Sequence, residues 1–301
     1  MSSSNNPAQI YVEAGTLHRL KPIFSLVGKA ISWSLIIIIT LWMTFPFLWA
    51  ISTSVKSPDD VYKNKYIPFI QYMPTLENWK AEISTRGREI LDGLTNSVIV
   101  GCGSAFLTTL LGALGGYALS RASFSKSRKE NLFTMILSQR MLLPAVTVIP
   151  YFIMMKTVGL IDHQGGLIVA YTTFNLAFAL LLMRDFFQSV PVELDEAALV
   201  DGATDLQSFR LIALPLAAPG LVTTFILVFA FSWNEFLYAL ALTYRQASTI
   251  PIVIAGAEDT RGIQFWYIST RTLIAILPPV IVVSFIQKYL VRGLTLGAVK
   301  G

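Results

Sequence analysis

Long apolar segments recur along the chain and are separated by polar stretches. A helix needs about 20 apolar residues to cross the hydrocarbon core of a membrane, and six segments approach or exceed that length. The sixth is the weakest, because only 272–287 is strictly apolar and Lys288 must extend its side chain toward the headgroups. The pattern predicts an all-α polytopic membrane protein with six transmembrane helices at 30–51, 93–120, 131–155, 165–183, 217–243 and 270–291.

The composition also indicates a membrane protein. Of the 301 residues, 54% are hydrophobic and 14% are charged, and the mean hydropathy is +0.60. Globular chains carry about 25% charged residues, so much of this surface must face lipid. A polar N-terminal tail at 1–24 precedes the membrane domain at 25–301, and we expect this tail to be partly disordered.

An even number of spans places both termini on the same side of the membrane. The loops on the two sides of the membrane carry similar total numbers of Lys and Arg residues, but the short loop after the second span is basic. By the positive-inside rule this loop favours cytoplasmic termini, through Arg121, Lys126, Arg128 and Lys129.

The acidic segment between the fourth and fifth spans predicts two short helices. Ser189 suits the N-cap of the first helix. Its apolar residues Leu194, Ala197 and Ala198 fall on one face at i, i+3 and i+4, a strip that another surface could approach closely. Gly202 is expected to end this helix as a C-cap.

A second helix is predicted directly after that glycine. Thr204 and Gln207 have capping-box spacing, and Pro215 is expected to end or kink the helix before the next span. An acidic loop on the cytoplasmic side runs against the positive-inside tendency, which suggests that the charges of the loop 188–212 serve a partner protein. The alternative is an amphipathic helix that lies in the membrane interface.

The spacing of this loop resembles a known motif. Glu196-Ala197-Ala198, Gly202 and Ile212-x-Leu214-Pro215 resemble the EAA loop of inner-membrane permeases of binding-protein-dependent ABC importers. The resemblance extends from Lys29 to the C-terminus and is closest to the smaller, six-helix subunit of maltose-type sugar permeases. Other stretches agree: Trp233-Asn234-Glu235-Phe236, the Pro144 and Pro150 pair, and Gly293-Leu-Thr-Leu-Gly297-Ala-Val-Lys300-Gly301.

The resemblance implies two contacts with an ATPase subunit. In the family the EAA loop forms a coupling helix that sits in a cleft of the ATPase, a role that passes here to Glu196, Ala197, Ala198, Asp201, Gly202, Leu214 and Pro215. The C-terminal tail 292–301 is implied to reach between the ATPases as an extended backbone, through Gly297, Lys300 and Gly301. A frayed terminus is the alternative reading of that tail.

Two charged residues, Arg140 and Glu235, fall inside predicted spans. Such groups usually face a bundle interior or water and mark a pathway. Together with Asn175, Trp233 and Asn234 they are candidates to line or gate the translocation path. The alternative is that they only form structural pairs between helices.

A loop at 244–271 on the outer side contains three consecutive small residues, Ala255, Gly256 and Ala257. In maltose-type subunits the corresponding loop probes the sugar cleft of the substrate-binding protein. The resemblance therefore implies that these residues contact a binding protein.

The sequence contains no pattern that supports an active site. It lacks a phosphate-binding Gly-x-x-x-x-Gly-Lys-Ser/Thr loop, and a single cysteine, Cys102, excludes an intrachain disulfide and a thiolate metal cluster. ATP and Mg are expected on a separate ATPase chain, with no cofactor bound by this one. The net charge of +5 fits basic cytoplasmic edges and does not predict nucleic-acid binding.

The predicted assembly is an importer in a bacterial inner membrane. It combines this chain with a second related permease as a heterodimer, two copies of an ABC ATPase, and a periplasmic or lipid-anchored solute-binding protein. The solute is a carbohydrate or sugar derivative of unspecified size. The alternatives are an ion-coupled secondary transporter, which usually shows repeated halves that are not found here, and a membrane scaffold without transport activity.

Overall fold

The computed structural model describes residues 7–63, 65–121, 125–259 and 262–298. Strands within them are confined to one antiparallel pair, β1 (Glu258–Asp259) and β2 (Gly262–Ile263). The longer helices are α1 (Pro7–Ser54), α3 (Glu77–Arg121), α4 (Lys126–Met141), α5 (Pro144–Thr157), α6 (Gln164–Gln188), α10 (Ala218–Trp233) and α13 (Phe265–Ala298). The shorter ones are α2 (Pro58–Tyr62), α7 (Val192–Val200), α8 (Asp205–Ser208), the π-helix η1 (Phe209–Ala213), α9 (Leu214–Leu216), α11 (Leu237–Leu242) and α12 (Ile250–Ala255).

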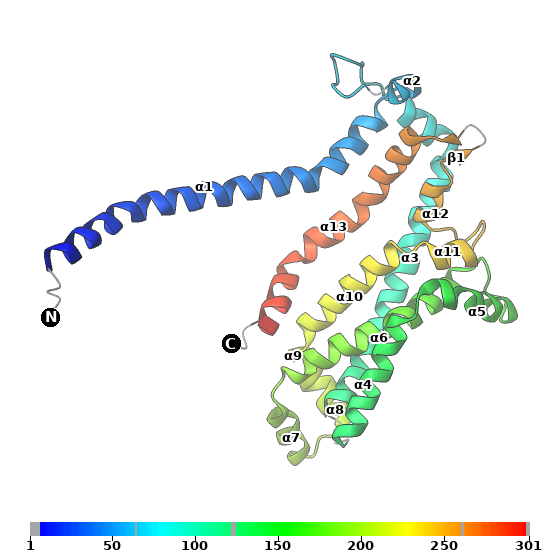
Figure 1. The fold of residues 1–301 in the computed structure, drawn as a ribbon. Helices are drawn as coiled ribbons and strands as arrows, with labels where there is room; N and C mark the ends of the chain where they lie inside the picture. The colour runs from blue at the N-terminus through cyan, green and yellow to red at the C-terminus, as the bar shows by residue number, and fades with distance from the viewer. Residues whose placement is uncertain (1–6, 64, 122–124, 260–261, 299–301) are drawn as a thin grey trace.

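Helix α3 runs through the bundle and packs along α6 and α10 (Figure 1). Small residues let α3 and α6 approach closely, as is common between membrane helices. A β-carbon on Gly116 would lie 2.7 Å from the backbone nitrogen of Arg184. The hydroxyls of Ser104 in α3 and Ser232 in α10 form a hydrogen bond of 2.9 Å inside the same unit. These contacts make α3 the central helix of the described chain.

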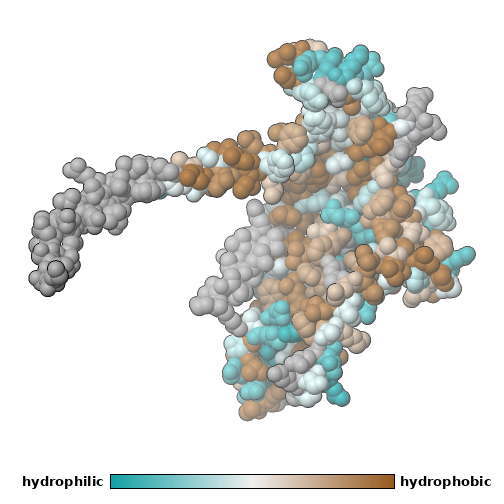
Figure 2. Space-filling view, viewed as in Figure 1, coloured by the Kyte–Doolittle hydropathy of each residue, from teal (hydrophilic) through white to brown (hydrophobic). Residues whose placement is uncertain are grey.

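The prediction of an all-α polytopic membrane protein is confirmed. Among the described residues four helices are long and apolar enough to cross a membrane, and the number reaches six if each of two bent helix pairs is one span. Figure 2 shows apolar surface over the middle of the molecule. Hydrophilic residues gather toward the end that carries α2 and toward the end that carries α7 and α8.

The predicted span at 131–155 is wrong as a single helix. Helix α4 ends at Met141, α5 begins at Pro144, and the two helices meet at 82°. Leu142 and Leu143 between them have extended backbones, with ψ of 124° and 132°. A residue that precedes proline is pushed out of the α conformation, and proline itself has no N–H to continue the helix. The break therefore follows from Pro144.

The predicted span at 217–243 is also interrupted. Helix α10 ends at Trp233, and α11 begins at Leu237. The carboxylate of Glu235 accepts the backbone N–H groups of Leu237, Tyr238 and Ala239 at 2.9–3.3 Å. This intramembrane charge therefore caps the start of a new helix, where the positive end of the helix dipole favours an anion.

The two ends of the chain differ from prediction. Residues 7–24 belong to α1 and not to a disordered tail, while 1–6 lie outside the described residues. Helix α1 leaves the bundle near α2 and extends away from it, with its apolar window wholly exposed (Figure 1). The predicted extended tail at 292–301 is helical up to Ala298, so Gly297 lies in α13. Lys300 and Gly301 lie outside the described residues.

Candidate coupling and translocation sites

Helix α7, which contains the Glu196-Ala197-Ala198 motif, begins differently from the prediction. Pro191 is its N-cap residue. Ser189 instead ends α6, where its hydroxyl donates to the carbonyl of Phe186 at 2.7 Å. Acidic residues in the first turn of α7, Glu193 and Asp195, lie where the helix dipole favours negative charge.

Gly202 ends α7 as predicted. Its φ of +89° is a left-handed conformation that side chains with a β-carbon rarely adopt. The N–H of Gly202 donates to the carbonyl of Leu199 at 3.1 Å, and the N–H of Ala203 donates to the carbonyl of Ala198 at 2.9 Å. This pair of bonds is a Schellman motif, which satisfies carbonyls at the helix end and turns the chain sharply.

The second helix of the loop also begins as predicted. Thr204 and Gln207 form a capping box at the start of α8. The helix then passes through η1 and α9, and a bend of 75° separates 205–216 from α10. The bend follows Pro215 at Ala217, in agreement with the expected kink.

The predicted apolar face of α7 is wrong in one respect. Ala198 is 8% exposed and points into the chain together with Asp195, whereas Leu194 and Ala197 are exposed. Glu196 is also exposed and makes no hydrogen bond or ion pair within the described residues. The outward surface of the loop mixes charged residues, such as Glu193, Asp205 and Arg210, with exposed apolar ones. The exposed apolar residues are Val192, Leu194, Leu199, Val200, Leu206 and Leu211.

A buried polar cluster holds α7 against the end of α3. The Nε of Arg121 donates to the Oδ2 of Asp195 at 2.6 Å, and its terminal nitrogens donate to the carbonyls of Phe187 and Val190 at 3.2 and 3.1 Å. The hydroxyl of Ser208 donates to the Oδ1 of Asp195 at 2.5 Å. One guanidinium and one carboxylate therefore join α3, the end of α6, α7 and α8.

Apolar packing supports this cluster from the membrane side. The rings of Tyr117, Phe187 and Phe209 contact one another with centroids 4.9–6.0 Å apart. Phe187 and Phe209 are buried with Met183 and Ala213 in one core cluster. Sequence reasoning used Arg121 only as a topology signal. Because Arg121 and Asp195 lie far apart in the chain, no local spacing could reveal their pairing.

The candidate pathway residues have different environments. Asn175 is 2% exposed, its Nδ2 donates to the carbonyl of Tyr171 at 3.0 Å, and its Oδ1 has no partner. Trp233 is buried against Phe229, so within this chain it does not line an open path. The side chain of Arg140, near the end of α4, lies outside the described residues.

Asn234 and Glu235 lie where the helix breaks between α10 and α11. Asn234 is exposed, and its Nδ2 donates to the carbonyl of Ala230 at 2.8 Å. Glu235 is half-buried and caps α11. Of the residues expected to line the path, this pair is the most accessible, and a role in translocation stays a prediction.

At the opposite end of the bundle a single carboxylate holds the segment that follows α11. Asp162 accepts the consecutive backbone N–H groups of Tyr244, Arg245, Gln246 and Ala247 at 3.0–3.2 Å. Burial acts to raise the pKa of Asp162, but these hydrogen bonds outweigh burial and hold the pKa below its usual value. Asp162 thereby fixes the segment that follows α11.

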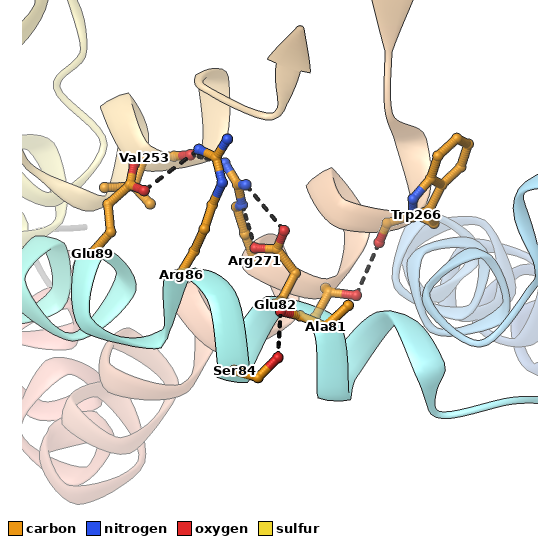
Figure 3. A network of polar contacts seen from close by, with 9 residues as sticks. Ala81, Glu82, Ser84, Arg86, Glu89, Val253, Trp266 and Arg271 are labelled. Atoms are coloured by element: carbon orange, nitrogen blue, oxygen red, sulfur yellow. Dashed lines mark hydrogen bonds and ion pairs between the residues drawn. The ribbon is translucent and has the colours of Figure 1, made fainter. Parts of the chain in front are cut away.

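A second buried ion pair lies at this end (Figure 3). Arg271 of α13 is 1% exposed and binds Glu82 of α3 through two nitrogens, at 2.7 and 3.1 Å. A third nitrogen donates to the carbonyl of Val253 in α12 at 2.5 Å. The pair therefore joins three helices, α3, α12 and α13.

The small residues expected to contact a binding protein lie at the end of α12, with Ala255 its last residue. Ala257 is 3% exposed in this chain and its carbonyl accepts from Gln264 at 3.4 Å. Contact of these residues with a binding protein stays a prediction. Ala255 and Gly256 are exposed. Gly256 lines a cleft of about 540 Å³ between α3 and this loop, with Arg86, Arg88, Glu89, Asp92, Tyr244 and Arg245 among its other residues.

Comparison with known proteins agrees with this architecture. Relatives include a trehalose transport system permease protein of Mycobacterium tuberculosis, with 35% identity over 85% of this chain and 92% of the relative. A trehalose/maltose transport system permease protein of Thermococcus litoralis has 32% identity over 94% of this chain and 98% of the relative.

Solved structures show the same fold. A chain of a bacterial ABC transporter that imports the acidic polysaccharide alginate matches with a TM-score of 0.70 and 22% identity, over 90% of this chain and 98% of that one. Residues 98–296 match the family described as the inner membrane component of binding-protein-dependent transport systems. The chain belongs to this family of inner-membrane transport components.

Proposed function

We propose that this chain is one permease subunit of an ATP-driven importer for a carbohydrate or sugar derivative. Family membership supports the transport role. The sugar class is supported by its relatives, whose names specify trehalose, trehalose and maltose, diacetylchitobiose and sulfoquinovosyl glycerol. The size of the sugar is left open because these relatives differ in it.

The observation that carries the coupling role is the loop formed by α7, Gly202 and α8. Its outward surface exposes apolar side chains, among them Leu194 and Val200, together with the free carboxylate of Glu196. Such a surface fits a protein cleft better than water, because exposed apolar groups favour burial. Asp201, Leu214 and Pro215 shape the ends of the same loop.

The partners follow from that role. Two copies of an ABC ATPase bind the permease pair from the cytoplasm, one of them at this loop. The ATPases carry ATP and Mg, so no cofactor is proposed for this chain. The end of α3 at Arg121 lies at the same end of the bundle as the coupling loop. Both termini are proposed to lie on this cytoplasmic side. The C-terminal residues Gly297, Lys300 and Gly301 are proposed to contact the ATPases.

A second, related permease completes the membrane part as a heterodimer. The exposed apolar surface of α1 is available to that subunit and to lipid. A periplasmic or lipid-anchored solute-binding protein delivers the sugar at the opposite end, near Ala255 and Gly256. Arg140, Asn175, Asn234 and Glu235 are the residues of this chain that border the path through the membrane.

ATP binding closes the two ATPases and moves the coupling loops, which opens the cavity toward the binding protein. Hydrolysis then returns the cavity to the cytoplasmic side. The chemistry of phosphate transfer takes place outside this chain. Its own contribution is to convert movement of a short loop into movement of long helices.

The test compares two glycines in the reconstituted complex, with binding protein and a panel of sugars. Gly202 has a φ of +89° and Gly159, in the turn after α5, has a φ of +72°, and a β-carbon on either would meet no atom within 4 Å. Gly202→Asp and Gly159→Asp therefore impose similar backbone strain. We expect only Gly202→Asp to abolish solute-stimulated ATPase activity in an assembled complex. Equal activities in the two variants, or no stimulation of wild type by any sugar, would contradict the proposal.

A further inference from the structure

Helix α3 has a buried ion pair near each of its ends. At the coupling end, Arg121 is the last residue of α3 and binds Asp195 of α7, with side chains 16% and 6% exposed. At the opposite end, Glu82 lies in the second turn of α3 and binds Arg271, with side chains 3% and 1% exposed. No other ion pair between the described residues has both side chains so little exposed.

The two pairs are separated by one unbroken helix. Between Glu82 and Arg121 lie 121 − 82 = 39 helical steps, or about 58 Å at the rise of an α-helix. Along that length α3 packs against α6 and α10. Two other paths across the bundle, α4 with α5 and α10 with α11, are interrupted, whereas α6 and α13 are also continuous helices. Of the continuous helices, only α3 takes part in both ion pairs.

The inner pair fixes more than two side chains. Arg121 also donates to two carbonyls at the end of α6, and Asp195 also accepts from Ser208 of α8. A planar guanidinium with several fixed hydrogen bonds resists rotation more than an apolar contact does. Displacement of α7 must therefore displace the end of α3 or break this cluster.

The outer pair meets the cleft near the loop that follows α12. Arg271 joins α3 to α13 through Glu82 and to α12 through the carbonyl of Val253, as Figure 3 shows. Val253 and Gly256 line the cleft, as do residues of α3 from 85 to 96. A shift of α3 along or about its axis therefore changes the shape of the cleft.

We propose that Arg121 is a positioning residue that locks the coupling loop onto α3, and that α3 carries movement of the loop as one rigid body to the cleft at the opposite end. Glu82 and Arg271 pass that movement to α12 and α13. This inference rests on the proposed function and adds to it the element that connects the two ends. It also predicts the reverse effect, in which a binding protein at the cleft influences the ATPases through the same helix.

The inner pair is tested with Arg121→Gln in the full complex with ATPases and binding protein. Arg184→Gln is the matched control, because Arg184 lies at the same end of the bundle and its ion pair with Asp185 is longer, at 3.8 Å, and more exposed. We expect Arg121→Gln to lower solute-stimulated ATPase activity and transport about fivefold or more while basal ATPase activity is retained. Arg184→Gln should retain both activities.

A distance measurement separates positioning from a merely structural role. Spin labels at Leu91→Cys in α3 and Arg210→Cys in η1, in a Cys102→Ser background, report whether α3 and the coupling loop move together; all three positions are exposed. We expect one distance distribution with and without ATP, and a second ATP-dependent distance after Arg121→Gln. An ATP-dependent distance in the protein with Arg121 intact would overturn the proposal.

The pair formed by Glu82 and Arg271 is tested by measuring the same ATPase and transport activities. Glu82→Gln leaves Arg271 buried without a counterion, so a second variant, Glu82→Met with Arg271→Met, removes both charges and retains bulk. Glu77→Gln is the control, because Glu77 lies exposed in the first turn of α3 and does not line the cleft. We expect the double variant to assemble and to lose stimulation by the binding protein while basal ATPase activity remains.

The two ideas fail in different ways. If wild type shows no solute-stimulated ATPase activity with any sugar, the proposed function fails. If wild type is stimulated and both Arg121→Gln and the Glu82, Arg271 double variant keep full stimulation, α3 does not connect the two ends and only this inference fails.

Discussion

At each end of the bundle a single charged side chain fixes one loop, and the two side chains have opposite charges. At the coupling end one cation, Arg121, donates to a carboxylate and to two backbone carbonyls. At the opposite end one anion, Asp162, accepts four consecutive backbone N–H groups. Arg121 fixes the short helices of the coupling loop, whereas Asp162 fixes a segment at 244–247 that has no regular structure. The cluster around Arg121 joins four separate elements, whereas Asp162 binds one segment, so the first is suited to transmit movement and the second to prevent it.

Among the substitutions that test this comparison, Asp162→Ala should cause the largest loss of stability. The substitution leaves several inward-facing backbone N–H groups without an acceptor, so we expect the free energy of unfolding to fall by about 4 kcal/mol. Thermal unfolding of the detergent-solubilised complex measures the loss. Asp92→Ala is the control, because Asp92 is exposed on the neighbouring part of α3. A loss no larger than that of the control would show that Asp162 does not hold the loop.

A double-mutant cycle on Arg121 and Asp195 is expected to give the next largest effect. Each single substitution, Arg121→Gln or Asp195→Asn, leaves its partly buried partner unpaired. We expect a coupling energy of about 2 kcal/mol in the free energy of unfolding. The same cycle on Arg184 and Asp185 should give a value close to zero, because surface pairs contribute little. If the effects of the two single substitutions were additive, the side chains of Arg121 and Asp195 would not interact.

Part of the molecule could be predicted from local sequence. Gly202 ends α7 and the capping box starts α8, because both signals act within a few residues of the chain. Apolar length predicted where the membrane helices lie, but not that two of them are interrupted. Pro144 and Glu235 are the sequence signals for those breaks. Proline removes a backbone N–H that the helix would need, and the Glu235 carboxylate accepts N–H groups that start a new helix.

The charged contacts that hold the two ends could not be predicted in this way. Arg121 and Asp195 lie 74 residues apart, and Asp162 binds residues 82 to 85 positions further on. Such pairs depend on which helices pack side by side, which a single sequence does not specify. Ser189 illustrates the same limit at short range, since it completes α6 and leaves the start of α7 to Pro191.

Acidification should weaken the contact that Asp162 makes at its end of the bundle. The folded-state pKa of Asp162 is lowered, so its stabilisation is fully present above the unfolded pKa of about 3.9 and is lost as pH falls through the folded value. Asp162→Asn removes this dependence because an amide does not titrate. The difference in unfolding temperature between wild type and Asp162→Asn should therefore narrow as pH decreases below about 4. A constant difference across that range would mean that the Asp162 carboxylate is not the stabilising group.

The smallest effect concerns two of the positive-φ glycines, Gly202 and Gly159, one at each end. Gly202→Ala and Gly159→Ala each force a β-carbon into a left-handed backbone without a steric clash, so each should lower the free energy of unfolding by about 1 kcal/mol. Asn tolerates this conformation better than Ala, so Gly202→Asn and Gly159→Asn should lose less. Chemical denaturation of the four variants measures the ranking. Ala and Asn variants of equal stability would mean that the backbone relaxes away from the left-handed region. If the ranking holds at both sites, any difference in transport between them arises from position, because only Gly202 sets the angle of the coupling loop.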